Sequence, residues 1–160
     1  MDKAVLRDAL VARLETEWES LLSSAQDAFN MATDAEHQSR SKYETFSLEA
    51  SYLARGQAER VAGLRADLDA LRGMSIDSCA AEDPVRLGSL IACYLPDGSV
   101  AYSYLVPVAG GERLNSALGE VQTVSAATPL GRKLLGKRMG ETVSVVQGDN
   151  TVSLRLSEIW

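Results

Sequence analysis

The chain has 160 residues, of which 46% are hydrophobic and 24% charged, and a formal net charge of −6 at pH 7. This composition excludes a disordered chain, because it is ordinary for a folded globular protein. Both the first 73 residues and the remainder carry more acidic than basic groups, whereas an autonomous nucleic-acid-binding domain normally presents a basic face to phosphates. We therefore expect a protein partner and no autonomous nucleic-acid binding.

The sequence carries no signature of a zinc site or a membrane segment. Cys79 and Cys93 are its only cysteines, and they form no CxxC pair and have no histidine nearby, which excludes zinc and thioredoxin-like motifs. No stretch approaches the roughly 18 apolar residues of a membrane span, and the first residues lack the apolar core of a signal peptide. We expect a cytoplasmic protein without membrane association.

Apolar residues recur at spacings of three and four in two long segments between residues 11 and 71. This spacing is typical of a coiled-coil seam and predicts two helices. Neither segment contains proline, and the polar connection between them is short enough to favour an antiparallel return. We predict an antiparallel coiled-coil hairpin over residues 1–73, with frayed residues 1–3. Its seam consists of Val11, Leu14, Trp18, Leu21, Ala25, Ala28 and Ala32 in the first helix, and Ala50, Ala54, Gln57, Val61, Leu64, Leu68 and Leu71 in the second.

Residues 33–46 have no apolar period, and we predict that they form the tip of the hairpin. This stretch contains Asp34, Glu36, His37 and Glu44, whose oxygen and nitrogen atoms are potential ligands of a divalent ion. These groups form no closed ligand set in the sequence. We therefore expect no intrinsic metal site.

The helical spacing stops near residue 73, and residues 74–84, which are small and acidic and end in a proline, predict a linker. Residues 85–160 predict a second domain of short strands. The runs 90–95 and 100–108 flank Pro96-Asp97-Gly98, a turn sequence that predicts a β-hairpin. A further strand is predicted at 121–124, and a closing hairpin by the runs 143–146 and 152–156.

A short helix is predicted within the sequence TPLGRKLLGK, which begins at Thr128. Threonine suits the N-cap, Pro129 suits the first helical position, and Gly136 suits the end of the helix. Three leucines would pack this helix on the sheet: Leu130, Leu134 and Leu135. Four basic residues would remain as a local cluster of positive charge: Arg132, Lys133, Lys137 and Arg138.

The segment TPLGRKLLGKRMGETVSV, with the strand pair after it, resembles the C-terminal signature of the bacterial Gre transcription elongation factors, GreA and GreB. That signature is Ser-Pro-(Ile/Met)-(Ala/Gly)-Arg-Ala-Leu-(Ile/Leu)-Gly-Lys…Gly-Asp-Glu-Val. The sequence VRLG at residues 85–88 resembles the family's entry into the same domain, and a long antiparallel coiled coil precedes it in the same order. The resemblance implies an α+β fold, in which an FKBP-like antiparallel β domain with a short helix docks on RNA polymerase. It places four residues in the docking loop: Thr128, Pro129, Leu130 and Arg132.

By the same resemblance, the hairpin would enter the secondary channel of the polymerase. Family members that stimulate transcript cleavage carry two acidic residues at the tip, in a Gly-Asp-Leu-x-Glu-Asn-Ala-Glu-Tyr run, which hold a second magnesium ion. Here the tip reads SRSKYETFSLEASY, with Arg40 and Tyr43 near the acidic positions. A cation at that place would repel a metal ion, and a two-metal mechanism needs an oxygen donor there. The remaining candidates are Glu44, Asp34 and Glu36.

We therefore expect a factor that modulates elongation or transcript cleavage. It would not be an enzyme, and at most it would stimulate the polymerase's own cleavage of RNA. We expect no tightly bound cofactor, only magnesium shared with RNA polymerase.

Two other functions stay open at this point. In the first, the coiled coil serves as an adaptor for another protein and has no cleavage role. In the second, the β domain is a peptidyl-prolyl isomerase, since some FKBP-type domains have that activity. An isomerase pocket needs an aromatic lining, and the second domain has no phenylalanine, which disfavours this function. Its aromatic residues are Tyr94, Tyr102, Tyr104 and Trp160.

Overall fold

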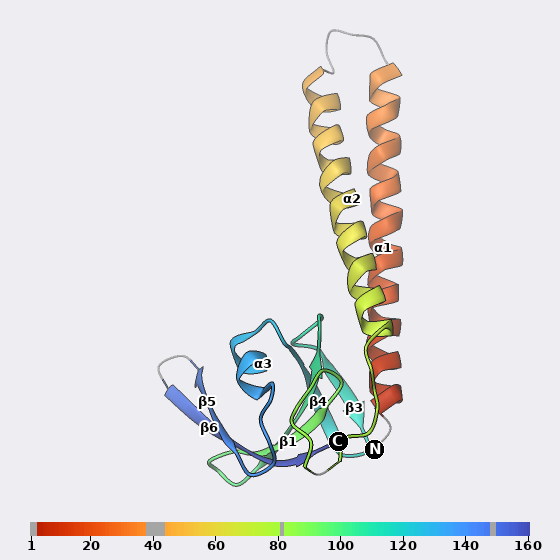
Figure 1. The fold of residues 1–160 in the computed structure, drawn as a ribbon. Helices are drawn as coiled ribbons and strands as arrows, with labels where there is room; N and C mark the ends of the chain where they lie inside the picture. Colours follow the sequence, from red (N-terminus) through yellow and green to blue (C-terminus); the bar gives the residue numbers. More distant parts are fainter. Residues whose placement is uncertain (1–2, 38–43, 81, 148–149) are drawn as a thin grey trace. The chain divides into compact units, whose positions relative to one another are not determined.

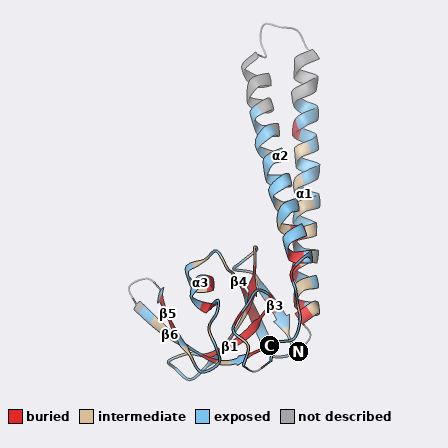
Figure 2. Cartoon of the chain, viewed as in Figure 1, coloured by how far each residue is buried: buried red, intermediate tan, exposed pale blue. Residues whose placement is uncertain are grey.

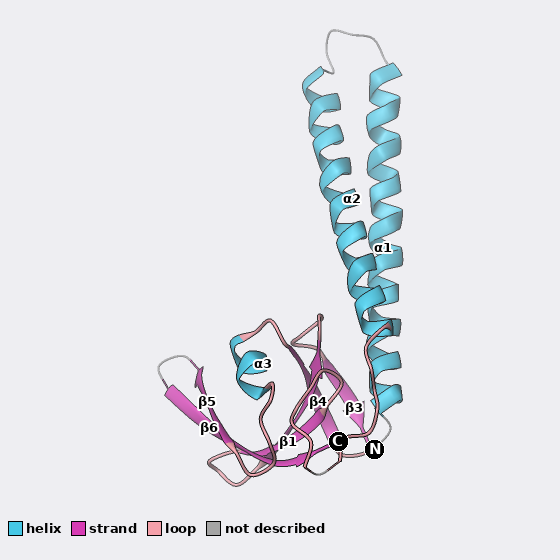
Figure 3. Ribbon diagram, in the orientation of Figure 1, coloured by secondary structure: helices cyan, strands magenta, loops and turns pink. Residues whose placement is uncertain are grey.

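A computed structural model describes residues 3–37, 44–80, 82–147 and 150–160. Two long helices come first, and a six-stranded sheet with one short helix follows (Figures 1 and 3). This confirms the predicted α+β order of a helical hairpin followed by a small β domain. The chain divides into two compact units: residues 11–69, here called the hairpin unit, and residues 1–10 with 70–160, here called the sheet unit.

The two helices of the hairpin are α1 (Lys3–His37) and α2 (Glu44–Arg72). The described seam residues of the hairpin unit are buried or half-buried, and nearly all of their helical neighbours are exposed (Figure 2). The predicted seam is thereby confirmed. At Trp18 the seam is reinforced by Arg65, whose guanidinium lies 5.8 Å from the centre of the indole ring and makes a cation–π contact.

The helices extend further toward the tip than the apolar period indicates. Residues 33–37 belong to α1, and residues 44–46 belong to α2, although we predicted all of them as tip. Helix propagation needs only favourable backbone propensity once a helix is nucleated, so it can continue beyond the last seam contact. Residues 38–43 lie outside the described residues.

The start of α1 also differs from the prediction. Lys3 does not fray: it is buried, with 5% of its surface exposed, and its Nζ donates a hydrogen bond to the backbone oxygen of Asp77 at 2.6 Å. Burial lowers the pKa of Lys3, because the charged ammonium loses its hydration. This contact ties the start of α1 to residues 74–80, which were predicted as linker and belong to the sheet unit.

The sheet has the strand order β3-β4-β2-β1-β6-β5. All neighbouring strands pair antiparallel except β2 and β4, which are parallel. The predicted hairpins β1–β2 and β5–β6 are confirmed, and β3 is a strand that the sequence did not indicate. The strands are β1 (Leu90–Tyr94), β2 (Val100–Val106), β3 (Arg113–Ser116), β4 (Gly119–Ser125), β5 (Thr142–Gln147) and β6 (Asn150–Ile159).

One hydrophobic cluster joins the sheet to the short helix α3 (Pro129–Leu134). Leu134 of α3 is buried in it, and Leu130 packs against it. The strand members of the cluster include Ile91, Leu105, Val143 and Leu156. Burying these side chains fixes α3 on the sheet next to β4 and β5, which positions the segment that carries the family resemblance.

Candidate docking surface

The predicted helix cap at Thr128 is confirmed. The Thr128 side-chain oxygen accepts a hydrogen bond from the Gly131 backbone N–H at 3.1 Å, and its hydroxyl donates to the Ser125 backbone oxygen at 2.7 Å. Pro129 follows at the first helical position, where its missing N–H costs nothing. After the helix, Gly136 adopts a φ of 77°, a left-handed conformation that favours glycine.

Gly131 is required by the close approach of α3 to the end of β4. A Cβ atom at this position would lie 2.1 Å from the Ser125 backbone oxygen and 2.9 Å from the Ala126 Cα. The same turn is fixed from the other side, since the Ala126 N–H donates to the Val106 oxygen at 2.9 Å and the Ser125 hydroxyl donates to the Pro107 oxygen at 3.2 Å. The loop before α3 is therefore held in one conformation by its own hydrogen bonds.

A hollow of about 380 Å³ lies between the start of α3 and the end of β5. Its wall includes the apolar side chains of Leu130 and Val145, and Val146 lies at its edge with 72% of its surface exposed. Apolar side chains that are gathered at one concave surface, unlike isolated exposed ones, are a common feature of binding sites. The lining residues are Thr128, Pro129, Leu130, Lys133, Val145 and Val146.

Two exposed cations next to this hollow are held by backbone carbonyl groups. A guanidinium nitrogen of Arg132 donates to the Ala127 oxygen at 2.6 Å, and Lys133 Nζ donates to the Ser144 oxygen of β5 at 2.6 Å. Each side chain is thereby limited to few conformations while its charge faces solvent.

The other two members of the predicted basic cluster bond elsewhere. Lys137 Nζ forms an ion pair with Glu141 at 2.8 Å, and the backbone N–H of Arg138 donates to the same carboxylate at 2.7 Å. The hydrogen bond from Lys137 is the main reason that the pKa of Glu141 lies below its ordinary value. The Arg138 guanidinium donates to the Glu82 backbone oxygen.

Three of the four residues expected in the docking loop thus line one hollow, and the fourth, Arg132, is exposed on α3 and bonds to the Ala127 oxygen. Lys133, Val145 and Val146 also line this hollow and were not predicted as part of the docking surface. A signal for Val146 was present, because two consecutive valines in a strand cannot both face the core.

The tip candidates lie on both helices at the same end of the hairpin (Figure 1). Asp34 and Glu36 belong to the last turn of α1, and Glu44 is the first residue of α2. Their side chains lie outside the described part of the chain, as do Arg40 and Tyr43 as a whole. Their role at the tip stays a prediction.

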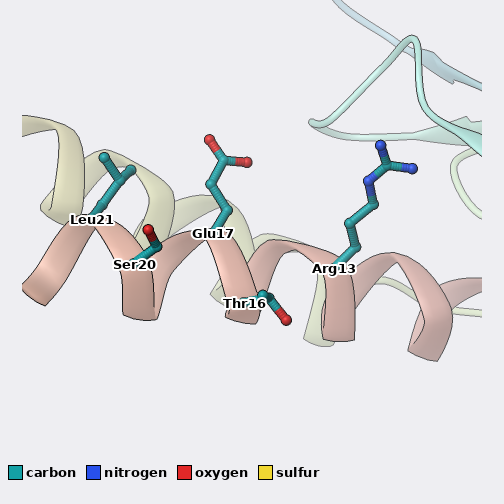
Figure 4. Close-up of a pocket in the computed structure, with 5 residues that line it drawn as sticks. All are labelled: Arg13, Thr16, Glu17, Ser20 and Leu21. Carbon is teal, nitrogen blue, oxygen red and sulfur yellow. The ribbon is translucent and has the colours of Figure 1, made fainter.

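Another hollow, of about 470 Å³, lies along α1 in the hairpin unit and is lined by residues of that helix alone (Figure 4). Its lining consists of Arg13, Thr16, Glu17, Ser20 and Leu21. Within the described residues, no three histidine, cysteine or acidic side chains are grouped as a metal site. None of the described helices is long and apolar enough to cross a bilayer.

The sequence matches no protein-family model, and curated proteins give no match. Among solved structures, the chain is similar to the GreA factor homolog 1 (Gfh1) protein of Thermus thermophilus, with 22% identity, 94% of each chain covered and a TM-score of 0.39. It is also similar to Gfh1 of Thermus aquaticus, with 22% identity over 92% of each chain and a TM-score of 0.40. A prokaryotic transcription elongation factor GreA/GreB from Nitrosomonas europaea is 17% identical, with 62% of this chain and 78% of that chain covered and a TM-score of 0.39. At these identities the similarity concerns the fold alone.

Proposed function

We propose that this chain is a Gre-like factor that binds RNA polymerase and modulates elongation or transcript cleavage. The sheet unit would dock through Thr128, Pro129, Leu130 and Arg132, and the tip of the hairpin would enter the secondary channel. The observation that supports the proposal is the segment TPLGRKLLGK, because the residues that resemble the Gre signature form a hydrogen-bonded cap and the start of α3 beside a mainly apolar hollow. A surface fixed before binding loses little conformational entropy when a partner docks.

The hairpin suits the second part of the proposal. Its helix α2 has 29 residues, which corresponds to about 44 Å of helix at 1.5 Å per residue. Its seam is narrow, and small alanines occupy it on the side of the tip. A slender pair of helices offers little room for an active site of its own, and it can carry residues 38–43 into a restricted opening.

In this proposal the chemistry belongs to the polymerase. The chain would not cleave RNA by itself, and any magnesium ion at the tip would be shared with the polymerase. Because the tip carries Arg40 where cleavage-stimulating factors have carboxylates, we propose modulation of the cleavage reaction, with Glu44 as the first candidate for a contact with the metal and Asp34 and Glu36 as the others.

The experiment has two parts. Purified chain is first incubated with core polymerase, and co-purification is measured; absence of association at micromolar concentration would reject the proposal. RNA shortening is then followed on a stalled, backtracked complex with wild type and with Glu44→Ala. A change of the cleavage rate by the wild type supports the proposal, and its loss in Glu44→Ala assigns the effect to that carboxylate.

The adaptor function, in which the coiled coil binds another protein, would instead be favoured by absence of association with the polymerase. The isomerase function finds no support at the hollow beside α3, since none of its six lining residues is aromatic.

A further inference from the structure

Lys133 distinguishes this docking surface from the family signature, which has alanine at the corresponding position. The side chain is exposed, yet its Nζ is fixed 2.6 Å from the Ser144 oxygen on β5, so the ammonium is held across the rim of the hollow. An ammonium group has three donors, and this bond uses one of them. The other two remain for a partner.

β5 is the edge strand of the sheet, and Ser144 lies in its middle. A lysine placed over an edge strand discourages further strand pairing there. The approaching element would therefore meet a fixed cation instead of a row of open backbone groups. Arg132, held by the Ala127 oxygen, adds a second exposed positive charge to α3.

Apart from Lys133 and Thr128, the residues that line the hollow are apolar. Pro129, Leu130, Val145 and Val146 contribute to the hollow, and Val146 is the most exposed of the large hydrophobic residues in the described part of the chain. A surface that combines an apolar hollow with fixed cations at its rim is complementary to an apolar side chain flanked by carboxylates. The chain as a whole carries a net charge of −6, so the sign of these two cations is opposite to the net charge of the chain.

We infer that the segment of RNA polymerase bound here is acidic: it places an apolar side chain in the hollow beside Val146 and a carboxylate against Lys133. This inference rests on the proposed function and names the chemistry of the partner. Lys133 is then a specificity-determining residue of this particular chain, in addition to the loop residues that the resemblance indicates.

The test measures the dissociation constant of the full chain for core polymerase between about 50 and 300 mM salt, where screening of exposed charges changes most. Lys133→Gln removes the charge and retains a donor. Arg113→Gln is the matched control, because Arg113 is also an exposed cation of the sheet unit and lies on β3, the opposite edge strand. Lys133→Arg keeps the positive charge and tests whether charge alone is sufficient for binding.

We expect Lys133→Gln to weaken binding about three- to tenfold at low salt, with a smaller difference at high salt. Arg113→Gln should stay within about twofold of wild type, and Lys133→Arg should restore most of the affinity. Binding by Lys133→Gln that equals or exceeds wild type at every salt concentration would overturn the inference.

A second pair of variants tests the hollow without disturbing the core. Val146→Asp places a carboxylate at its edge and should weaken binding at least about tenfold, because it removes apolar contact and repels an acidic partner. Val100→Asp, on the exposed start of β2, should bind like wild type. If Val146→Asp and Val100→Asp changed the affinity for polymerase equally, the inference about this hollow would be contradicted, whereas the proposed function would still stand. Failure of the wild type to bind polymerase would instead reject the proposed function, and the inference with it.

Discussion

Replacement of Gly131 by alanine tests whether the docking loop is held as described. Gly131 lies in α3, and its backbone conformation is not left-handed, so helix propensity alone would favour alanine by about 1 kcal/mol. The structure predicts that the substitution lowers the stability instead. The new Cβ would lie 2.1 Å from the Ser125 oxygen, and that oxygen accepts hydrogen bonds from the Thr128 N–H at 3.0 Å and from its hydroxyl at 2.7 Å.

Moving the Ser125 carbonyl group far enough to relieve this clash would break both hydrogen bonds to Thr128. Each such bond contributes about 1 kcal/mol net, and a half-buried carbonyl left without a partner costs more. We therefore expect Gly131→Ala to lower the free energy of unfolding of the sheet unit by about 2 to 4 kcal/mol. Affinity for polymerase should fall as well, because the loop is displaced.

The assay is urea denaturation followed by Trp160 fluorescence in a Trp18→Phe background, so that the signal comes from the sheet unit. Gly56→Ala is the matched control, since Gly56 is also helical and a Cβ atom added there would meet no neighbouring atom within 4 Å. That variant should stabilise the hairpin by up to about 1 kcal/mol, measured by thermal denaturation. Unchanged or increased stability of Gly131→Ala would refute the close approach of α3 to β4.

Three further predictions concern buried polar groups. Gln57 Oε1 is buried in the hairpin seam without a hydrogen-bond partner among the described residues, so Gln57→Leu should raise the thermal stability of the hairpin by about 1 to 2 kcal/mol; a lower melting temperature would show that the amide is satisfied. The Tyr104 hydroxyl is likewise buried without a partner in the described chain, so Tyr104→Phe should leave the stability in urea unchanged or raise it by about 1 kcal/mol; a clear loss of stability would show that the hydroxyl has a hydrogen-bond partner. Burial raises the pKa of the Cys93 thiol from 9.0 to about 11, which means that the folded state keeps a proton that the unfolded state releases. This contribution is complete below pH 9 and is lost toward pH 11, so wild type should lose about 2 kcal/mol more than Cys93→Ala over that range in urea titrations, and parallel pH profiles would refute it.

The hairpin was predictable because its determinants are local. Spacings of three and four fix one face of each helix, and burial follows that face from Leu14 to Ala28 and again from Ala54 to Leu68. The cap of α3 was predictable for the same reason, since Thr128, Pro129 and Gly136 each have a defined role within one or two turns.

The parts that were not predicted depend on contacts between distant residues. Strand β3 has the sequence RLNS, in which only Leu114 is buried, and it is a strand because β4 pairs with it. β2 and β4 pair in parallel although they are not consecutive in the chain, and no pattern of residues in either strand indicates this pairing. The bond from Lys133 to Ser144 joins α3 to β5, so the hollow becomes visible only when both elements are in place.

In the proposed function, the tip of the hairpin would enter the secondary channel toward the active centre of RNA polymerase while the sheet unit docks outside. A photoreactive amino acid in place of Ser41, within the predicted tip, tests this in a stalled elongation complex with labelled RNA. We expect a cross-link to the RNA 3′ end or to the polymerase residues around it, and loss of that cross-link when Val146→Asp disrupts the docking surface. If the bound protein cross-linked only to the outer surface of the polymerase, entry of the tip into the secondary channel would be contradicted.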